Sequence, residues 1–321
     1  HIVGDQAVAA CDELERQLAL ADAGIALDEH AGAEHFEKHA MDGGDFGHAL
    51  RHTLRKSKLT AVSAALTLFI LIVAIFAPQI APYDPSLGNY RTMLQPPSPT
   101  HPFGTDELGR DILSRVVYGT RITITIGVTA LLVGLVLGVT IGLVTGYFGG
   151  VIDLIGMRFI DILLSFPGIL LAILISSTFG GGLLPVIIAI GMYSVPTFAR
   201  ITRGSVLVTR EKGFVEAARA IGASTTRILL RHVLANIQGP IVVYATLRMA
   251  SAVLTTAFLS FLGVGVAPPA PEWGLMVNTA RDFMRDAPHV ILFPGMAIFV
   301  TVLVFNLLGD GLRDLFDVQQ Q

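Results

Sequence analysis

Six long apolar stretches divide the chain from residue 59 onward. Their approximate bounds are 59–80, 122–147, 152–178, 183–203, 239–263 and 290–308. A helix of about 20 apolar residues crosses the hydrocarbon core of a bilayer. Because lipid offers no hydrogen-bond partners, each span must satisfy its own backbone groups, and a helix does so. The pattern predicts an all-α membrane protein built as a bundle of six transmembrane helices.

The composition supports this fold class. Hydrophobic residues make up 52% of the 321-residue chain and charged residues only 15%, whereas about a quarter of the residues in a soluble domain are charged. Cys11 is the one cysteine, so an intrachain disulfide is excluded, and no Cys/His cluster has metal-site spacing. We therefore expect a chain embedded in a lipid bilayer, with no metal, no cofactor of its own and no nucleic-acid partner.

The distribution of charge divides the chain into two segments. Residues 1–50 hold eleven acidic and two basic residues, a net charge of −9, and the remainder carries +6. A basic cluster follows the acidic stretch and contains Arg51, Arg55, Lys56 and Lys58. We expect an acidic N-terminal segment over 1–50 and a transmembrane domain over 51–321.

The loops between the apolar stretches differ in their content of Lys and Arg. With a cytoplasmic N-terminus, the inner segments hold Arg51, Arg55, Lys56, Lys58, Arg200, Arg203, Arg210, Lys212, Arg219, Arg227, Arg231 and Arg313, and the outer ones only Arg91, Arg110, Arg115, Arg121, Arg281 and Arg285. Because basic residues accumulate on the cytoplasmic side of membranes, both termini are predicted to be cytoplasmic. Large outer loops then cover 81–121 and 264–289, and a large inner loop covers 204–238.

Three features lie inside the spans. The second span carries Gly134, Gly138, Gly142 and Gly146 at a spacing of four, which lets another helix approach closely; the stripe serves packing or, alternatively, a moving gate. Ionisable groups inside spans are costly and face protein or a water-filled cavity, and here they are Arg158, Asp161 and Arg248. Arg158 and Asp161 share a helical face, so they form an internal ion pair or line a substrate path.

Pro167 and Pro196 can kink the third and fourth spans.

The inner loop is too patterned for a simple connector. Glu216, Ala217 and Ala218 begin a short helical stretch that ends at Gly222, a residue suited to the left-handed turn that terminates a helix. Ser224 can cap a second helix through Leu234. We expect two short helices that form a compact cytoplasmic knob, in which Ala217 and Ala218 keep one side flat for another protein.

The outer loops predict surface elements. Thr105, Asp106 and Glu107 are typical of a helix start, and the apolar residues after them share one face. We expect an amphipathic helix near 105–118 at the outer surface, and we expect Trp273 to anchor the second outer loop at the membrane interface.

The string EAARAIGASTTRILLRHVLAN, residues 216–236, resembles the coupling loop of binding-protein-dependent ABC importer permeases. Glu216, Ala217, Ala218, Gly222 and Leu234 match the family pattern at its spacing. Further strings resemble the permeases of dipeptide, oligopeptide and nickel importers, and they are HPFGTDELGRDILSRVVYGTR at 101–121, MRFIDILLSFP at 157–167, LSFLGVGVAPPAPEWG at 259–274 and FNLLGDGLRDLFD at 305–317.

The resemblance implies a permease subunit of the bacterial inner membrane that imports dipeptides or oligopeptides. It implies four further components, namely a second related permease that completes a heterodimer, two cytoplasmic ATPase subunits and an extracytoplasmic substrate-binding protein docked over the outer loops. No Gly-Lys dipeptide occurs in the chain, so a Walker A phosphate loop is absent. ATP and Mg²⁺ are then expected to be used by the partner subunits, with residues 216–235 transmitting their motion and no catalytic residue in this chain.

Two alternatives stay open at this stage. The same family resemblance includes permeases that import nickel, opines or another small solute. A secondary transporter is a different class, which requires a relay of intramembrane acids, and Asp161 is the one acid deep in a span.

Overall fold

A computed structural model describes residues 58–318 of the chain. The acidic segment 1–50, Cys11 and the first part of the basic cluster lie outside the described residues. The helices are α3 (Lys58–Ile75), α4 (Ala77–Ile80), α5 (Ile112–Phe148), α6 (Gly150–Ser165), α7 (Gly168–Thr178), α8 (Leu183–Thr209), α9 (Gly213–Ala220), α10 (Thr225–Arg227), α11 (Leu234–Phe261), α12 (Trp273–Ala280) and α13 (His289–Val318). Short 3-10 turns cover Tyr90–Thr92 and Arg281–Phe283, and a π-helical stretch covers Ile228–Val233.

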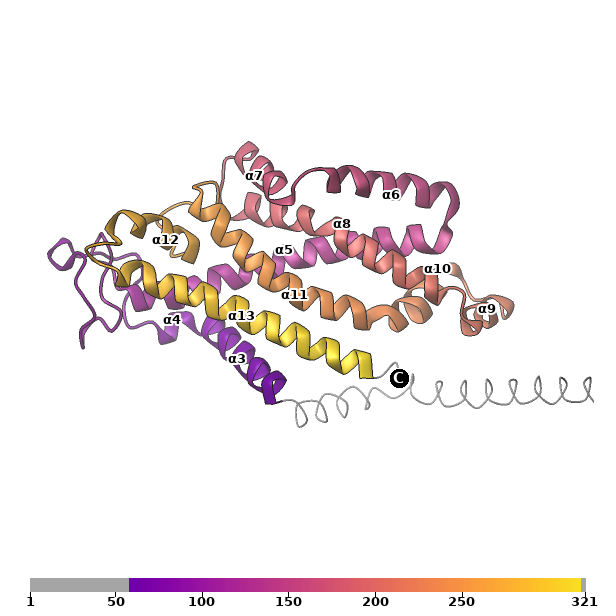
Figure 1. Cartoon of the computed structure of the whole chain (residues 1–321), viewed down its shortest axis with the longest axis horizontal. Helices are drawn as coiled ribbons and strands as arrows, with labels where there is room; N and C mark the ends of the chain where they lie inside the picture. The colour runs from indigo at the N-terminus through magenta and orange to yellow at the C-terminus, as the bar shows by residue number, and fades with distance from the viewer. Residues whose placement is uncertain (1–57, 319–321) are drawn as a thin grey trace, which may run out of the picture. The chain divides into compact units, whose positions relative to one another are not determined.

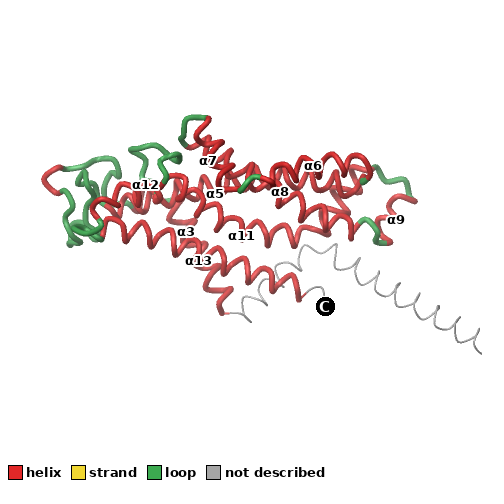
Figure 2. The backbone as a smooth tube through the Cα atoms, turned by 45° about the horizontal axis from the view of Figure 1, so that its top comes forward, coloured by secondary structure: helices red, strands yellow, loops and turns green. Residues whose placement is uncertain are grey.

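The long helices confirm the predicted all-α membrane fold. Within residues 58–318 no strand is formed (Figure 2). Five continuous helical segments are long and apolar enough to cross a bilayer: α3, α5, α8, the run from α10 through α11, and α13. The pair α6 and α7 makes a sixth candidate, although its two halves are bent by 86°.

The predicted third span, 152–178, is therefore not one straight helix. Proline has no backbone N–H and disfavours helical geometry in the residue before it. Phe166 is accordingly extended, with φ −87° and ψ 134°, and α7 restarts after Pro167. Pro196, by contrast, lies inside a continuous α8.

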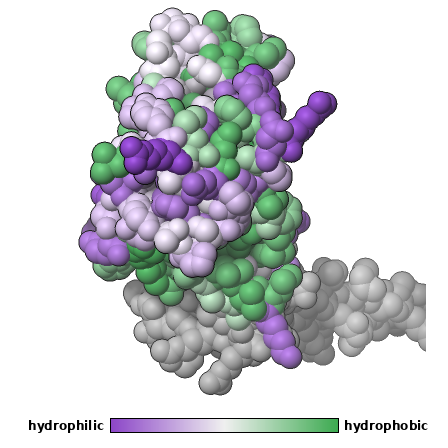
Figure 3. Space-filling model, turned by 90° about the vertical axis from the view of Figure 1, so that its left-hand side faces the viewer, coloured by the Kyte–Doolittle hydropathy of each residue, from purple (hydrophilic) through white to green (hydrophobic). Residues whose placement is uncertain are grey.

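Three long helices form the centre of the bundle. α5 packs against α8 and α11, α3 and α13 lie together along one flank, and α6 and α7 lie along another (Figure 1). The connections gather at the two ends: residues 81–111 and 262–288 form the loop end, and α9 lies at the opposite end (Figure 1). Figure 3 faces the loop end, where hydrophilic and apolar side chains are interleaved.

The loop end corrects the prediction of an amphipathic helix at 105–118. Gly104 and Gly109 adopt positive φ, 78° and 69°, which is incompatible with a right-handed helix through this segment. The helix begins instead at Ile112, where the Asp111 carboxylate caps α5 by accepting from the Ser114 N–H at 2.8 Å. Residues 112–118 are thus the first turns of the second span.

Trp273 also differs from its prediction as an interfacial anchor. Its side chain is buried, only 2% exposed, and its Nε1–H donates to the carbonyl oxygen of Val116 at 3.0 Å. The indole therefore holds α12 against α5 inside the loop end. Its polar atom finds a protein partner there, and this satisfies the N–H as interfacial water would have done.

The glycine stripe of α5 faces α8. A Cβ placed on Gly134 would lie 2.6 Å from Ser194 Cβ, one on Gly138 2.5 Å from Phe198 Cβ, and one on Gly142 2.5 Å from the carbonyl oxygen of Ala199. Gly146 meets Val206 in the same way, at 2.9 Å. Each distance is shorter than non-bonded heavy atoms allow, so glycine sets the separation of the two helices.

Candidate functional site

The knob is residues 210–233, the connection between α8 and α11. α9 is followed by Gly222 with φ +79°, and Ser224 Oγ then accepts from the Arg227 N–H. The positive φ suits a residue without Cβ. A helix, a left-handed glycine and a capped second helix therefore occur in the order that the sequence predicts.

The second helix of the knob is not a separate short helix as predicted. It continues from α10 through the π-helical stretch into α11 without an interruption. Leu234 is the first residue of α11 and packs against the apolar cluster beneath the knob, which contains Val206, Val215, Ala218, Ile228 and Val233. The second helix of the knob and α11 are thus one continuous helical segment.

The exposed face of α9 holds Glu216 and Ala217, and Ile221, which directly follows the helix, is 85% exposed. Ala218 is buried at 4% and packs inward. The prediction that both alanines form one flat outer side is wrong, because consecutive residues of a helix point about 100° apart. Of these two alanines, Ala217 lies on the outer face and Ala218 does not.

Basic side chains fasten the knob to the end of α5. Arg210 donates from Nη1 to the carbonyl oxygen of Gly146 at 2.9 Å. Arg219 donates from Nε to the Tyr147 hydroxyl at 3.3 Å, and its guanidinium carbon lies 5.1 Å from the centroid of the same ring. The Arg210 contact thereby connects Gly146, the last glycine of the stripe, to the knob.

The intramembrane acid Asp161 does not pair with Arg158. Its Oδ1 accepts from Arg200 Nη2 of α8 at 2.7 Å. A second pair, between Arg203 of α8 and Asp153 of α6, has two hydrogen bonds of 2.5 and 2.6 Å. The residues on one face of α6 are thus paired across helices, because α8 presents arginines opposite them, and Arg158 is exposed on this chain.

Arg248 lies in the middle of α11 within a polar and aromatic group. Its Nη2 donates to Ser194 Oγ at 3.1 Å. Its guanidinium carbon lies 4.6 Å from the Tyr193 ring centroid and 5.9 Å from that of Tyr244. We call Arg248, Tyr193, Ser194 and Tyr244 the Arg248 cluster. The sequence indicates Arg248 as an intramembrane charge, and Tyr244 lies four positions before it on the same helix. Tyr193 and Ser194 come from α8, and no spacing in the sequence indicates them.

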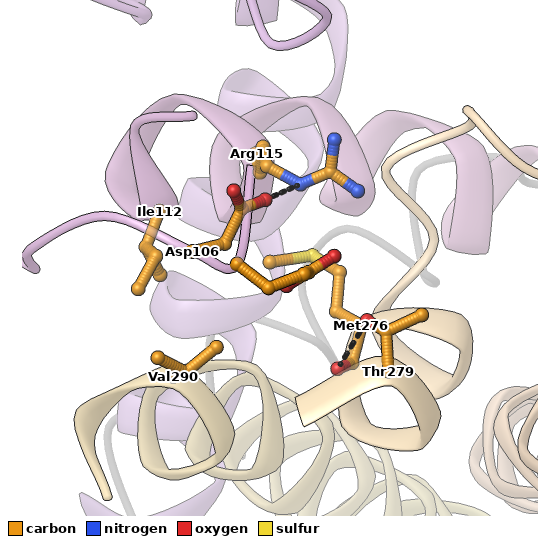
Figure 4. A pocket seen from close by; sticks show the side chains of 7 residues that line it. Asp106, Ile112, Arg115, Met276, Thr279 and Val290 are labelled. Carbon is orange, nitrogen blue, oxygen red and sulfur yellow. Dashed lines mark hydrogen bonds and ion pairs between the residues drawn. The ribbon is translucent and has the colours of Figure 1, made fainter. Parts of the chain in front are cut away.

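Residues of the loop end form a small pocket between its two segments. Asp106, Glu107, Ile112, Arg115, Met276, Thr279 and Val290 line it (Figure 4). Arg110 donates from Nε to Asp106 Oδ2 at 2.6 Å, and Arg115 Nε lies 3.3 Å from the same oxygen. These pairs connect the segment before α5 to the first turns of α5.

Glu272 stabilises the second segment of the loop end. Its carboxylate accepts from the N–H groups of Gly274 and Leu275 at 3.0 and 2.9 Å and so caps α12. Burial raises the pKa of Glu272, while the hydrogen bonds from Gly274, Leu275 and Ser260 oppose that shift. No group of His, Cys, Asp and Glu suited to a metal occurs within residues 58–318.

Comparison with known families gives two matches. Residues 138–319 match the binding-protein-dependent transport system inner membrane component. Residues 46–97 match the N-terminal transmembrane domain of oligopeptide transport permease C. The chain belongs to the binding-protein-dependent permeases of ABC importers. The family is described as the inner membrane component of binding-protein-dependent transport systems, and the relatives below are permease proteins.

Individual relatives agree with this family. The chain is 47% identical over 271 residues to the glutathione transport system permease protein GsiD of Escherichia coli O1:K1, covering 84% of this chain and 89% of the relative. The GsiD protein of Shigella dysenteriae serotype 1 is 46% identical over the same length. An inward-facing structure of the MetNI methionine ABC transporter has a TM-score of 0.52 at 21% identity, covering 64% of this chain and 97% of that one, and shows a shared permease fold.

Proposed function

We propose that this permease imports small peptides or peptide-like solutes. The match to oligopeptide permease C over 46–97 and the 47% identity to a glutathione permease support this substrate class. It imports them, in this proposal, as one half of a heterodimer with a second related permease. Two cytoplasmic ATPase subunits hydrolyse Mg-ATP for the assembly, and an extracytoplasmic binding protein delivers the substrate.

The observation that carries the mechanism is the continuous connection between the knob and α11. In our proposal Glu216, Ala217 and the exposed Ile221 present the surface that an ATPase subunit contacts. Gly222 sets the angle between α9 and the following helix, and Leu234 packs that helix on the cluster below. In this proposal, closure of the ATPase subunits shifts α10 and α11 together as one rigid body. Rigid-body shifts of packed helices at subunit interfaces are a common form of conformational change.

The proposed orientation places both termini and the knob in the cytoplasm of a bacterial cell and the loop end outside. The excess of Lys and Arg at the knob end supports this direction. At the loop end the ion pairs of Arg110 and Arg115 and the buried cap of Glu272 hold two segments in fixed positions. A rigid surface of this kind suits repeated docking of a binding protein.

The assembled importer, reconstituted in liposomes with its ATPases and its binding protein, tests this function. Uptake of a labelled tripeptide or glutathione should require ATP on the knob side and binding protein on the other. ATP hydrolysis should rise when loaded binding protein is added. Uptake driven by a proton or sodium gradient without ATP would contradict the proposal and would favour a secondary transporter.

A further inference from the structure

Arg248 forms no ion pair with any acid among residues 58–318, including Asp310 of α13, which follows the Gly309 that packs on Leu247. It lies about midway along α11, and the sequences of α5, α8 and α11 contain no Asp or Glu. The two acids of the neighbouring α6, Asp153 and Asp161, are paired with Arg203 and Arg200. Among the described residues Arg248 Nε has no hydrogen-bond acceptor.

A lone cation of this kind requires an explanation. Charged groups within a membrane are costly and almost always face a water-filled path or a counter-charge. Ser194 and the two tyrosine rings stabilise the guanidinium only partly, since a cation–π contact does not supply an opposite charge. The side chain is partly exposed rather than enclosed. The group is thus positioned but not neutralised.

Helix packing holds the cluster in place. Ser194 is opposite Gly134 and Phe198 is opposite Gly138 on the glycine stripe, and Phe198 in turn meets the Tyr244 ring edge-on at 5.2 Å. The Tyr193 ring lies against the break between α6 and α7, where a Cβ on Gly168 would come within 1.8 Å of its Cε2. The cluster therefore joins the fixed contact of α5 and α8 to the broken span.

The broken span gives a second indication of a water-filled path. Ser165, Phe166 and Pro167 are exposed on this chain. Non-helical backbone at membrane depth is tolerated where protein covers it or where it lines an aqueous cavity. An unneutralised arginine and an interrupted helix thus occur side by side, joined by Tyr193.

We propose that Arg248 binds the carboxylate of the substrate as it crosses the membrane. The inference rests on the proposed function, because a peptide with a free C-terminus supplies an anion, whereas no acid of residues 58–318 forms an ion pair with Arg248. A guanidinium presents paired N–H donors that match the two oxygens of a carboxylate. Ser194 and the tyrosine rings keep the guanidinium oriented, and release follows when the helices move.

The test compares two probes, trialanine and trialanine amide, which differ in the terminal carboxylate. Each is supplied at a concentration that saturates the binding protein, and uptake is measured in liposomes with the complete importer. The wild type should transport the acid at least tenfold faster than the amide. Arg248→Gln should slow the acid at least tenfold and the amide less than twofold, so that the two rates become similar.

Two further variants separate charge from packing. Arg248→Lys keeps the cation without the paired donors, and it should retain a reduced preference for the acid. Arg121→Gln removes an exposed arginine of the same bundle and should leave both rates and their ratio unchanged. Co-purification of the second permease with each variant is measured in parallel.

Several results would contradict the proposal that Arg248 binds the substrate carboxylate. Equal losses for acid and amide in Arg248→Gln or in Arg248→Lys would assign Arg248 a structural role. Loss of the second permease from the purified Arg248→Gln complex would show that a carboxylate of that subunit is the counter-charge. No uptake of either probe by the wild type would instead reject the peptide substrate class, so the two failures are distinguishable.

Discussion

Arg203 of α8 holds Asp153 of α6 through two parallel hydrogen bonds, Nε to Oδ1 at 2.5 Å and Nη2 to Oδ2 at 2.6 Å. The two side chains are partly buried, 30% and 20% exposed. Bidentate pairs of this geometry are among the stronger polar contacts in proteins. Because α6 is largely exposed on this chain and Ile160 is its one buried residue, the pair helps to fix its position against α8.

Asp153→Asn should therefore destabilise the subunit. It leaves Arg203 without its carboxylate, a loss of about 1 to 3 kcal/mol for a hydrogen bond to a charged group. A lower midpoint of thermal unfolding in detergent checks this. Asp161→Asn is the matched control, since it removes a single bond between half-exposed side chains and should lower the midpoint less. Equal midpoints for both variants would contradict the assigned role of the Arg203 pair.

Gly138 tests the close approach of α5 and α8. An added methyl group would lie 2.5 Å from Phe198 Cβ and 2.7 Å from the carbonyl oxygen of Val195, so α8 must shift. Overpacking of this kind costs about 1 to 3 kcal/mol, and Gly138→Ala should lower the thermal midpoint. Gly204→Ala, on α8 with open space around it, should be neutral or slightly stabilising, because alanine favours helices.

The sequence predicted the membrane spans well because their signal is local. Each requires only about 20 apolar residues in succession, and five of the six occur as continuous helical segments. The sequence alone does not show that the helix breaks at Pro167 and continues through Pro196. Proline restricts φ and lacks an N–H at both positions. Whether the helix recovers depends on neighbouring contacts, here the packing of Tyr193 against Gly168.

The candidate sites were predictable to different degrees. The knob has a contiguous motif, so Gly222 and Ser224 were placed by local turn and capping preferences. The sequence does not identify Arg200 as the ion-pair partner of Asp161. Arg158 is a possible partner only three positions away on the same helix, whereas Arg200 lies 39 positions away. The Arg248 cluster combines α8 and α11, and a single sequence contains no information on which faces of two helices meet.

Glu272 gives a pH dependence of stability. Its pKa is raised in the folded chain, so the folded state binds more protons than the unfolded state above the ordinary value of 4.5. Stability from this group is therefore present at low pH and declines as pH rises through the raised pKa. Glu272→Gln loses one acceptor oxygen for the cap, a cost of about 1 kcal/mol, but it carries no charge at any pH.

The thermal midpoint of the wild type should thus exceed that of Glu272→Gln most at acidic pH, and the difference should shrink as pH rises. Unfolding scans of both chains in the same detergent at several pH values measure it. A difference that grows with pH would show that the carboxylate is favoured in the fold, against the burial argument.

The orientation can be tested with two single cysteines in a Cys11→Ala background. Ser224 is exposed on the knob and Ala267 is exposed at the loop end. In intact cells an impermeant thiol reagent should label Ala267→Cys and leave Ser224→Cys unlabelled until the membrane is opened. Both positions are loop residues, so substitution should not perturb a span. The reverse labelling would place the knob outside and contradict its contact with cytoplasmic ATPases.

Gly222 provides the sharpest test of coupling. Its φ is +79°, and no atom lies within 4 Å of the position that a Cβ would take, so a substitution acts through backbone strain and not through a clash. In a β-branched residue this geometry costs at least about 1 to 2 kcal/mol, whereas asparagine tolerates it. Gly222→Val should change the angle between α9 and α10, and Gly222→Asn should preserve it.

In the assembled importer, substrate-stimulated ATP hydrolysis should fall about tenfold or more in Gly222→Val, which corresponds to about 1.4 kcal/mol of coupling free energy, and stay near wild type in Gly222→Asn. Glu216→Lys should also uncouple, because it reverses the charge on the exposed face of α9. Substrate binding by the isolated binding protein precedes the motion and should be unchanged in every case. Normal stimulation in a well-assembled Gly222→Val complex would show that the knob does not transmit the motion of the ATPases.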